Sequence, residues 1–358
     1  MTDKQIDVIG DFLRFYPYKS TFKMYRSALK KFFETMGCPS DKYFSTNRNY
    51  DTDLYDFALI MQGYAPKTFH SYINIVKTFF LEYDIKISQK TTRRIRRLKC
   101  SSRPLTQDRL PTLVELKRIL SYADLKMKTL VLFLLSSGIR IGEAVSIRLE
   151  DMSTKTSPVK VYLRASFTKT KTPRVGFISD EASFYLKEWL TRREDYLKLA
   201  ASYTNIPGSS KKINDDRIFP FTKSAAQQAF QRLLRLANLE DRDKETGHRL
   251  IHLHVFRKYF RTKMALELPN DAVEMLMGHE GYLARAYVRY TEEELSEQYK
   301  KGMHLVSVYD KYPEELKQLE SEIKRRDDRI RRIEKRVDVV ETMKELAKIL
   351  ENHKKGLT

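Results

Sequence analysis

Residues 254–290 restrict the fold of this chain more than any other stretch, because two short helices must form there a few residues apart. In the first pattern, HVFRKYF, His254 and Arg257 lie at i and i+3 and therefore share one helix face. The second pattern, DAVEMLM, ends at Gly278, a residue type that commonly terminates helices, and His279 follows directly. We therefore expect both histidines and the arginine near one point of a helical domain.

Two tyrosines follow at positions that a catalytic phenol could occupy. Tyr287 and Tyr290 come eight and eleven residues after His279. An arginine guanidinium can bind two phosphate oxygens at once, imidazoles transfer protons, and a tyrosine oxygen can attack phosphorus. Together these residue types favour chemistry on a phosphodiester over chemistry on a carbonyl.

The charge of the chain supports a polyanionic partner. Its 358 residues carry 67 Lys and Arg against 47 Asp and Glu, a formal net charge of +20, which favours nucleic acid or an anionic membrane surface. The longest apolar run, 129–139, is too short to cross a bilayer. No signal peptide opens the chain, and two cysteines do not form a disulfide framework or a cysteine metal site. We expect a cytoplasmic, nucleoid-associated protein with no membrane partner.

Residues 1–95 are expected to form a helical domain that clamps DNA. Apolar residues recur at helical spacing in STFKMYRSALKKFFETM, and further helices are predicted over 51–62 and from Pro66 onward. We interpret their aromatic residues as core. The cations left on or near the outer face of the first helix are candidate DNA contacts, with a solvated charged face as the alternative for any one of them: Lys23, Arg26, Lys30 and Lys31.

Residues 90–99, KTTRRIRRLK, carry six positive charges and no acidic residue. The two prolines and polar residues of 101–111 predict an extended linker, and we assign 96–111 to it. Because the basic run stands between two globular segments, we expect a strap along DNA phosphates, with a solvated tail as the alternative. Its candidate contacts are Arg93, Arg94, Arg96 and Arg97.

Residues 112–308 predict a second domain of many helices and few strands, so the fold class is mainly α with a small β-sheet (α+β). Helices are predicted over 112–122, 125–135, 180–196 and 225–237. Short strands are predicted over 159–163, 166–167 and 174–178. The remainder, 309–358, is dense in charge with apolar residues at heptad positions, which predicts a helical or coiled-coil tail.

Four motifs in order resemble those of the tyrosine recombinases, the phage-integrase family. SSGIRIGEAVSIRLEDM is similar to the family's first arginine box, with Arg140 as its arginine and Glu143 as its glutamate. HVFR resembles the H-x-x-R box and LMGHE the L-G-H box. TKTKTPRVGFIS resembles the β-hairpin with the family's mobile lysine, which places Lys169 at the matching position. The helical N-terminal part and the linker resemble the core-binding domain and interdomain strap, so the resemblance spans about 10–305.

The position of the nucleophile departs from the usual family pattern. The family's tyrosine commonly lies nine residues after the L-G-H histidine, which here is Val288. Tyr287 resembles the tyrosine of archaeal-type integrases, whereas Tyr290 and Thr291 resemble the Tyr-Thr pair of many bacterial members. Three residues apart, the two tyrosines are expected to share a helix face. We favour Tyr287 as nucleophile and keep Tyr290 as the alternative.

The resemblance implies strand cleavage through a 3′-phosphotyrosyl intermediate, without metal, other cofactor or ATP. Arg140 and Arg257 would bind the non-bridging phosphate oxygens, and Glu143 would orient Arg140. The proton-transferring and hydrogen-bonding roles would fall to His254 as general base, His279 on a phosphate oxygen, and Lys169, with Lys171 as alternate, on the leaving 5′-oxygen. Taken singly, Arg140 could be an ordinary arginine paired at a helix start, and either histidine could be structural.

The resemblance also implies partners: double-stranded DNA with its attachment sites, and a homotetramer on two paired sites. In the family a C-terminal segment docks into the neighbouring subunit, and here 292–303 and the following HLVSVY would be that segment. The charged tail favours the integrase of a virus, plasmid or integrated element over a chromosome-dimer resolvase. The two domains joined by a strap, and a C-terminal segment like the one exchanged in the family, argue against a type IB topoisomerase. Outside this chemistry, the alternatives are a catalytically silent DNA-binding or architectural protein and a metal-dependent nuclease.

Overall fold

The chain folds into two compact units, each of which is made of two segments of the sequence. One unit holds the described residues up to Asp108 together with Asp241–Leu250, and the other holds those from Arg109 to Glu240 and from Ile251 onward. The computed structural model describes residues 7–98, 107–154, 156–168, 171–202, 214–278 and 290–309. The predicted fold class, mainly α with a small β-sheet, is confirmed. Within the described part no helix is long and apolar enough to span a membrane.

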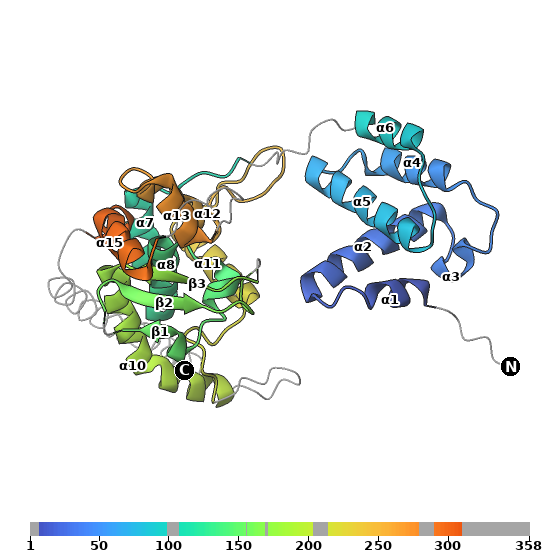
Figure 1. Cartoon of the computed structure of the whole chain (residues 1–358). Coiled ribbons are helices and arrows are strands. Elements are labelled where there is room, and N and C mark those ends of the chain that lie inside the picture. The colour runs from blue at the N-terminus through green and yellow to red at the C-terminus, as the bar shows by residue number, and fades with distance from the viewer. Residues whose placement is uncertain are drawn as a thin grey trace, which may run out of the picture. The chain divides into compact units, whose positions relative to one another are not determined.

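Helices α1 to α6 make up the first unit (Figure 1). They span Val8–Leu13, Lys19–Met36, Ser40–Tyr43, Tyr50–Met61, Pro66–Glu82 and Gln89–Leu98. Their apolar stripes meet in a core rich in aromatic rings, where Phe32 packs edge-to-face on Phe57 and Phe80 at centroid distances of 5.3 and 5.5 Å. The prediction that the aromatic residues of these helices form a core is confirmed.

Local sequence explains where these helices begin and end. The side chain of Asn49 caps α4 by accepting a 3.1 Å hydrogen bond from the Thr52 amide. Pro66 occupies the first turn of α5, where its missing N–H costs nothing. Helix α2 ends at Gly37, whose φ of 61° suits a residue without a Cβ.

The basic run is helical from residue 90 to residue 98, within α6, and not an extended strap. Thr91 and Ile95 are buried on one face of this helix, which packs against α4. The Lys77 ammonium of α5 donates a 3.0 Å hydrogen bond to the Thr92 hydroxyl. A helical conformation wins because one apolar face, although narrow, can be buried while the charges stay in water. Residues 99–106 lie outside the described part.

The second unit surrounds a small antiparallel sheet with helices (Figure 1). Strands β1, β2 and β3, at Met152–Ser153, Val159–Leu163 and Arg174–Ile178, lie in that order, with Val161 opposite both Met152 and Gly176. Helices α7 to α13, with η1 between α9 and α10, span Leu113–Ser121, Leu125–Ser137, Ile141–Ala144, Leu149–Asp151, Asp180–Ser202, Lys223–Leu236, Val255–Met264 and Asn270–Met277. Helix α15 at Glu292–Gly302 and η2 at Met303–Val306 follow.

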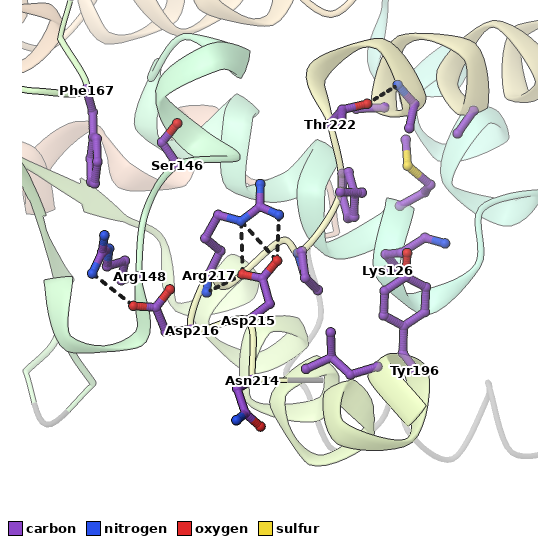
Figure 2. Close-up of a pocket in the computed structure, with 17 residues that line it drawn as sticks. Lys126, Ser146, Arg148, Phe167, Tyr196, Asn214, Asp215, Asp216, Arg217 and Thr222 are labelled. Atoms are coloured by element: carbon purple, nitrogen blue, oxygen red, sulfur yellow. Dashed lines mark hydrogen bonds and ion pairs between the residues drawn. The ribbon is translucent and has the colours of Figure 1, made fainter. Parts of the chain in front are cut away.

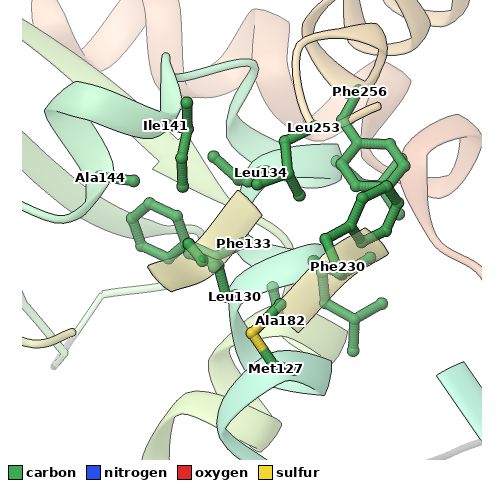
Figure 3. Close-up of a cluster of buried hydrophobic side chains, with 14 of the residues drawn as sticks. Met127, Leu130, Phe133, Leu134, Ile141, Ala144, Ala182, Phe230, Leu253 and Phe256 are labelled. Atoms are coloured by element: carbon green, nitrogen blue, oxygen red, sulfur yellow. The ribbon is translucent and has the colours of Figure 1, made fainter. Parts of the chain in front are cut away.

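Helix α8 is the centre of this unit. It contacts α10, α11, α12 and β3, and most of its residues are buried. Figure 3 shows its side chains meeting those of neighbouring helices, among them Leu130, Phe133, Phe230 and Phe256. A helix that is apolar all round must be enclosed by other elements. The elements packed around α8 therefore fix the position of its C-terminal end.

The strand predictions are confirmed except for one. Val159–Leu163 and Arg174–Ile178 are strands, but Ser166 and Phe167 lie in a turn, closed by a 3.0 Å bond from the Phe167 amide to the Arg164 carbonyl. Strand β1 was not predicted, because two residues are too few to show alternation.

The segment expected to dock into a neighbour packs on its own chain. Tyr299 of α15 is fully buried and donates a 2.7 Å hydrogen bond to the Ser136 carbonyl at the end of α8. Further along, the Glu181 carboxylate accepts bonds from the amides of Val308 and Tyr309 at 3.0 and 2.9 Å. These contacts lie within one chain, so docking of this segment into a neighbouring subunit stays a prediction, and the predicted tail from 310 onward lies outside the described residues.

Tyr299→Phe is expected to lower the free energy of unfolding by about 1–2 kcal/mol, because the buried Ser136 carbonyl loses its donor. Chemical denaturation of the purified protein measures this difference. Tyr162→Phe, on the exposed side of β2, is the matched control and should leave stability within about 0.5 kcal/mol of wild type. Equal losses of stability in the two variants would contradict a stabilising hydrogen bond between Tyr299 and the Ser136 carbonyl.

Candidate active site

The arginine box forms a tight turn between α8 and α9. Helix α8 ends at Gly138, with φ of 61°, and a Cβ there would come within 2.4 Å of the Phe260 ring. Arg140 then occupies the N-cap of α9, with Glu143 three residues on. The Arg140 amide donates to Glu143 Oε2 at 3.2 Å and its Nη1 donates to Oε1 at 3.0 Å. The expected pairing of Glu143 with Arg140 is therefore present.

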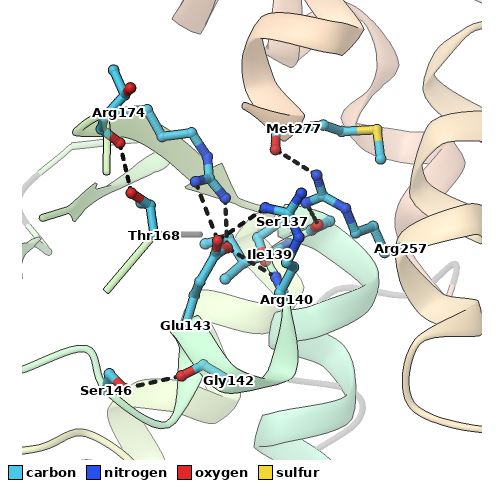
Figure 4. A network of polar contacts seen from close by, with 12 residues as sticks. Ser137, Ile139, Arg140, Gly142, Glu143, Ser146, Thr168, Arg174, Arg257 and Met277 are labelled. Atoms are coloured by element: carbon cyan, nitrogen blue, oxygen red, sulfur yellow. Dashed lines mark hydrogen bonds and ion pairs between the residues drawn. The ribbon is translucent and has the colours of Figure 1, made fainter. Parts of the chain in front are cut away.

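Glu143 also binds a second arginine, which the sequence reading did not select. Arg174, the first residue of β3, donates from Nη2 to Glu143 Oε2 at 2.6 Å, so the carboxylate lies between two guanidinium groups (Figure 4). Burial alone would raise the pKa of Glu143, but the hydrogen bond and charge of Arg174, and then those of Arg140, hold it below its ordinary value. Glu143 is thus a buried anion that holds two cations in place.

Arg257 lies on α12 and joins two separate turns. Its side chain is buried, and its terminal nitrogens donate to the carbonyls of Gly138 and Met277, each at 2.5 Å. Burial, and then the charge of Arg140, lower the pKa of Arg257 to about 9, so the guanidinium stays protonated at neutral pH. A guanidinium has five N–H donors, and these two bonds use two of them.

The L-G-H motif begins where α13 ends. Gly278 ends this helix with φ of 65°, and a Cβ at this position would meet the Arg174 side chain at 2.5 Å from Cδ. The glycine therefore serves both the left-handed turn and the close approach of Arg174. Its neighbour His279 lies outside the described residues, as do Lys169 and Tyr287.

His254 stands at the N-cap of α12, one turn before Arg257, as the spacing predicts. Its ring lies parallel to that of His252, with centroids 6.4 Å apart. Partial desolvation of the imidazole, and then the charges of His252 and Arg257, lower the pKa of His254, although the side chain remains exposed. A neutral, accessible imidazole at neutral pH can accept a proton.

The two alternates from the sequence reading have less suitable surroundings. Lys171 precedes β3 in a turn with φ of 59°, so it lacks the strand geometry that would place it on the same face as Lys169. Tyr290 is not helical, so the expected helix face shared with Tyr287 is wrong. The Tyr290 ring is half-buried and packs against the apolar cluster that includes Phe260 and Leu276.

The candidate DNA contacts of the first unit lie on its surface. Lys23, Arg26 and Lys30 of α2 line one open groove of about 510 Å³ with Phe22 and Ser27. Lys31 is half-buried. The four arginines predicted as contacts on α6 are all exposed: Arg93, Arg94, Arg96 and Arg97.

A larger cavity of about 1090 Å³ lies elsewhere in the second unit (Figure 2). Arg148 and Arg217 line it and pair with Asp216 and Asp215 of the same cavity. Of the predicted catalytic residues that the structure describes, none lines it. Among the residues that the structure describes, no three His, Cys, Asp or Glu side chains are grouped as metal ligands would be.

The site as described is therefore a cluster of three arginines around one carboxylate. The charges of Arg140 and Arg174 both act on Arg257, and three cations against Glu143 leave a formal charge of +2. Sequence motifs identified every member except Arg174. The available signal was a charged residue opening an otherwise apolar strand, which is too common to select a site.

A cluster with this excess of positive charge can bind an anionic group such as a phosphate. The phage integrase family model matches residues 103–294, more than half of the chain and all of the motifs described above. The chain belongs to the phage integrase family.

Two curated relatives are similar over part of their length. Tyrosine recombinase XerA of Pyrococcus horikoshii is 28% identical over 178 residues, which cover 49% of this chain and 56% of that protein. A probable integrase/recombinase of Acholeplasma phage L2 is also 28% identical over 178 residues, covering 49% of this chain and 52% of that protein. The chain thus spans about half the length of the curated relatives it matches.

Solved structures share the fold at low sequence identity. The Tn1549 transposon integrase in complex with circular intermediate DNA has a TM-score of 0.55 at 17% identity, covering 82% of this chain and 97% of that one. A lambda integrase dimer bound to a core site has a TM-score of 0.52 at 12% identity, covering 80% and 78%. At these identities the likeness concerns the fold alone.

Gly278→Ala is expected to cost about 3 kcal/mol of stability, from the left-handed φ and from the collision with Arg174. Gly142→Ala is the matched control, because Gly142 lies in α9 with nothing within 4 Å of an added Cβ. That change should be neutral or stabilising by about 0.5–1 kcal/mol. Thermal and chemical unfolding of both variants measure the difference, and a Gly278→Ala protein as stable as wild type would refute the close contact.

Proposed function

We propose that this protein is a site-specific DNA recombinase, the integrase of a mobile element, which cleaves and rejoins strands through a 3′-phosphotyrosyl linkage. The observation that carries the proposal is the cluster of Arg140, Arg174 and Arg257 around Glu143. A five-coordinate phosphorane carries more negative charge than a phosphodiester. Cations fixed before the reaction therefore stabilise the transition state more than the bound substrate.

The two family arginines differ in access to a substrate. About a quarter of the Arg140 side chain is exposed, at 25%, whereas Arg257 is only 4% exposed and holds two backbone carbonyls. We infer that Arg140 makes the more direct contact with a non-bridging oxygen. Arg257 contributes its charge at short range in surroundings of low dielectric.

The proposed reaction conserves the energy of the phosphodiester. The tyrosine oxygen attacks phosphorus as its proton passes to His254, and the bond from phosphorus to the 5′-oxygen breaks. Lys169 gives a proton to the leaving 5′-oxygen, and His279 hydrogen-bonds a phosphate oxygen. A 5′-hydroxyl from another strand then reverses the step, so no nucleotide triphosphate is consumed. The roles of Lys169 and His279 follow from their places in the family motifs.

We propose Tyr287 as the nucleophile. The packing of Tyr290 against the apolar cluster of α12 and α13 supports this choice, because a nucleophile must leave its neighbours to reach phosphorus. The position of Tyr287, eight residues after His279, lies one residue short of the usual family spacing.

The first unit is proposed to bind double-stranded DNA by contacts with the sugar-phosphate backbone of the DNA. The groove with Lys23, Arg26 and Lys30 and the exposed arginines of α6 supply the cations for phosphate contacts. Assembly as a tetramer on two attachment sites, and the choice of integration over the resolution of chromosome dimers, belong to this proposal. The charged composition of 309–358 supports both.

The nucleophile is tested with a nicked suicide duplex that carries the element's own attachment site, incubated with protein in the presence of a chelator. We expect a covalent adduct on a denaturing gel with wild type and Tyr290→Phe, and none with Tyr287→Phe, because only the loss of the attacking oxygen prevents bond formation. An adduct lost only with Tyr290→Phe would reassign the nucleophile. If wild-type protein binds the duplex but forms no adduct, the result would favour the alternative of a catalytically silent DNA-binding protein.

His254 as general base predicts an unusual pH dependence. Because the pKa of His254 is lowered from its ordinary 6.5, the imidazole stays neutral as the pH falls through that value. The second-order rate constant of adduct formation at subsaturating duplex, which reports the free protein, should therefore be flat from about pH 8 to below pH 6.5 and fall only in more acidic buffer.

The fall of the rate in acidic buffer should be absent in His254→Gln. This variant should also react about 100-fold more slowly than wild type at neutral pH. His248→Gln, outside the motifs, is the control and should keep the wild-type profile. A rate that already falls between about pH 8 and pH 7 would show that another group is the base.

A further inference from the structure

Arg174 lies at the point where two motifs meet, although it belongs to neither. Only 10% of its side chain is exposed. Its guanidinium binds Glu143 of the arginine box, with Nη2 2.6 Å from Oε2 and Nη1 3.5 Å from Oε1. Its stem lies against Gly278 of the L-G-H motif so closely that any Cβ there would collide with it. One side chain therefore spans the interval between the two motifs (Figure 4).

The contact with Glu143 restricts Arg140. The two carboxylate oxygens are divided, since Arg140 Nη1 binds Oε1 while the shorter Arg174 bond holds Oε2. Without Arg174, Oε2 would keep the 3.2 Å bond from the Arg140 amide alone, and the carboxylate could rotate. Because Arg140 is partly exposed, its bond to Glu143 is the described contact that fixes the direction of its guanidinium.

The contact with Gly278 restricts the turn that leads into His279. Gly278 ends α13 in the left-handed conformation, and the Arg174 stem fills the space beside its Cα. Val175 and Phe177, further along β3, pack in the same apolar cluster as Leu276 and Met277 of α13. Apolar packing thus holds β3 and the end of α13 together, and Arg174 is the residue with which β3 begins.

The Nε of Arg174 distinguishes this residue from an ordinary structural arginine. It is buried and has no hydrogen-bond partner among the residues that the structure describes. A buried donor without a partner costs about 1–3 kcal/mol. The contacts of Arg174 with Glu143 and with the Gly278 turn must offset this cost.

We propose that Arg174 is a positioning residue for strand cleavage, which holds Glu143 and through it Arg140, and which forms the surface on which the Gly278 turn closes. The inference rests on the proposed recombinase function. It assigns to the first residue of β3 the task of keeping the arginine box and the L-G-H motif in one fixed geometry. Cleavage rates are sensitive to such geometry, since a displacement of about 1 Å can cost about 100-fold.

The test separates the chemical step from binding. We would compare wild type with Arg174→Lys, Arg174→Gln, Glu143→Gln and the double variant Arg174→Lys/Glu143→Gln, on the suicide duplex that the wild type cleaves. Two quantities are measured for each: the Kd for the duplex, and the single-turnover rate of adduct formation at saturating duplex. Arg164→Lys is the matched control, because Arg164 also pairs with two carboxylates beside the same sheet, those of Glu150 and Asp151.

Arg174→Lys should lower the cleavage rate about 100-fold with Kd within about threefold, because an ammonium is a point charge that cannot hold Glu143 and pack on Gly278 as a planar fork does. Arg174→Gln should be slower still. Since Arg174 acts through Glu143, the double variant should be about as slow as the slower single one, not slower by the product of the two effects. The control should stay within about twofold of wild type.

Three outcomes would overturn the inference. The first is an Arg174→Lys protein that cleaves within about threefold of wild type. The second is a double variant whose loss equals the product of the single losses. The third is loss of the folded state in both Arg174 variants, seen by thermal unfolding, because a positioning role requires a folded site that reacts slowly. Failure of the proposed function itself is separate, since the wild type would then form no adduct on the bound duplex.

Discussion

The buried carboxylate of Glu143 is the interaction on which the rest of the site depends. An isolated charge in a protein interior is costly, so Glu143 can be buried only with cations beside it. Arg140 comes from its own turn, but Arg174 comes from a strand that begins 31 residues later. The turn after α8 and the start of β3 must therefore form together. Removing either cation would leave the anion only partly compensated, which couples the order of the site to the packing of the sheet against α8.

Arg257 is a buried cation that binds the ends of two helices. It donates to the carbonyls of Gly138 and Met277, at the C-terminal ends of α8 and α13. Both helices end on a left-handed glycine, which exposes the last carbonyls, and a helix C-terminus carries partial negative charge. Helix ends thus stabilise Arg257 without neutralising it. The cluster keeps its excess positive charge, as a site for a phosphate requires.

The sequence was informative wherever a signal is local. Helical periodicity and caps located α2, α4, α5, α8 and α13, and the motif spacing placed His254 one turn from Arg257. Contacts between distant residues left no such signal. In the sequence Arg174 is one more cation after a basic turn. Its carboxylate partner Glu143 lies 31 residues earlier in the chain. Helix α6 was not predicted because the charges of the basic run hide the apolar face of Ile95, and the packing of Leu295 and Tyr299 of α15 on their own chain also leaves no local signal.

The same excess charge links substrate binding to the proton acceptor. In the structure the pKa of His254 is lowered by partial desolvation and then by electrostatic repulsion from His252 and Arg257. A phosphodiester bound at Arg140 would bring negative charge close to that imidazole and oppose their repulsion, which raises its affinity for a proton. Linkage makes the effect reciprocal, so a protonated His254 would in turn hold the phosphate more tightly. A base that is neutral before binding and stronger after it suits a reaction in which proton transfer accompanies the development of charge on phosphorus.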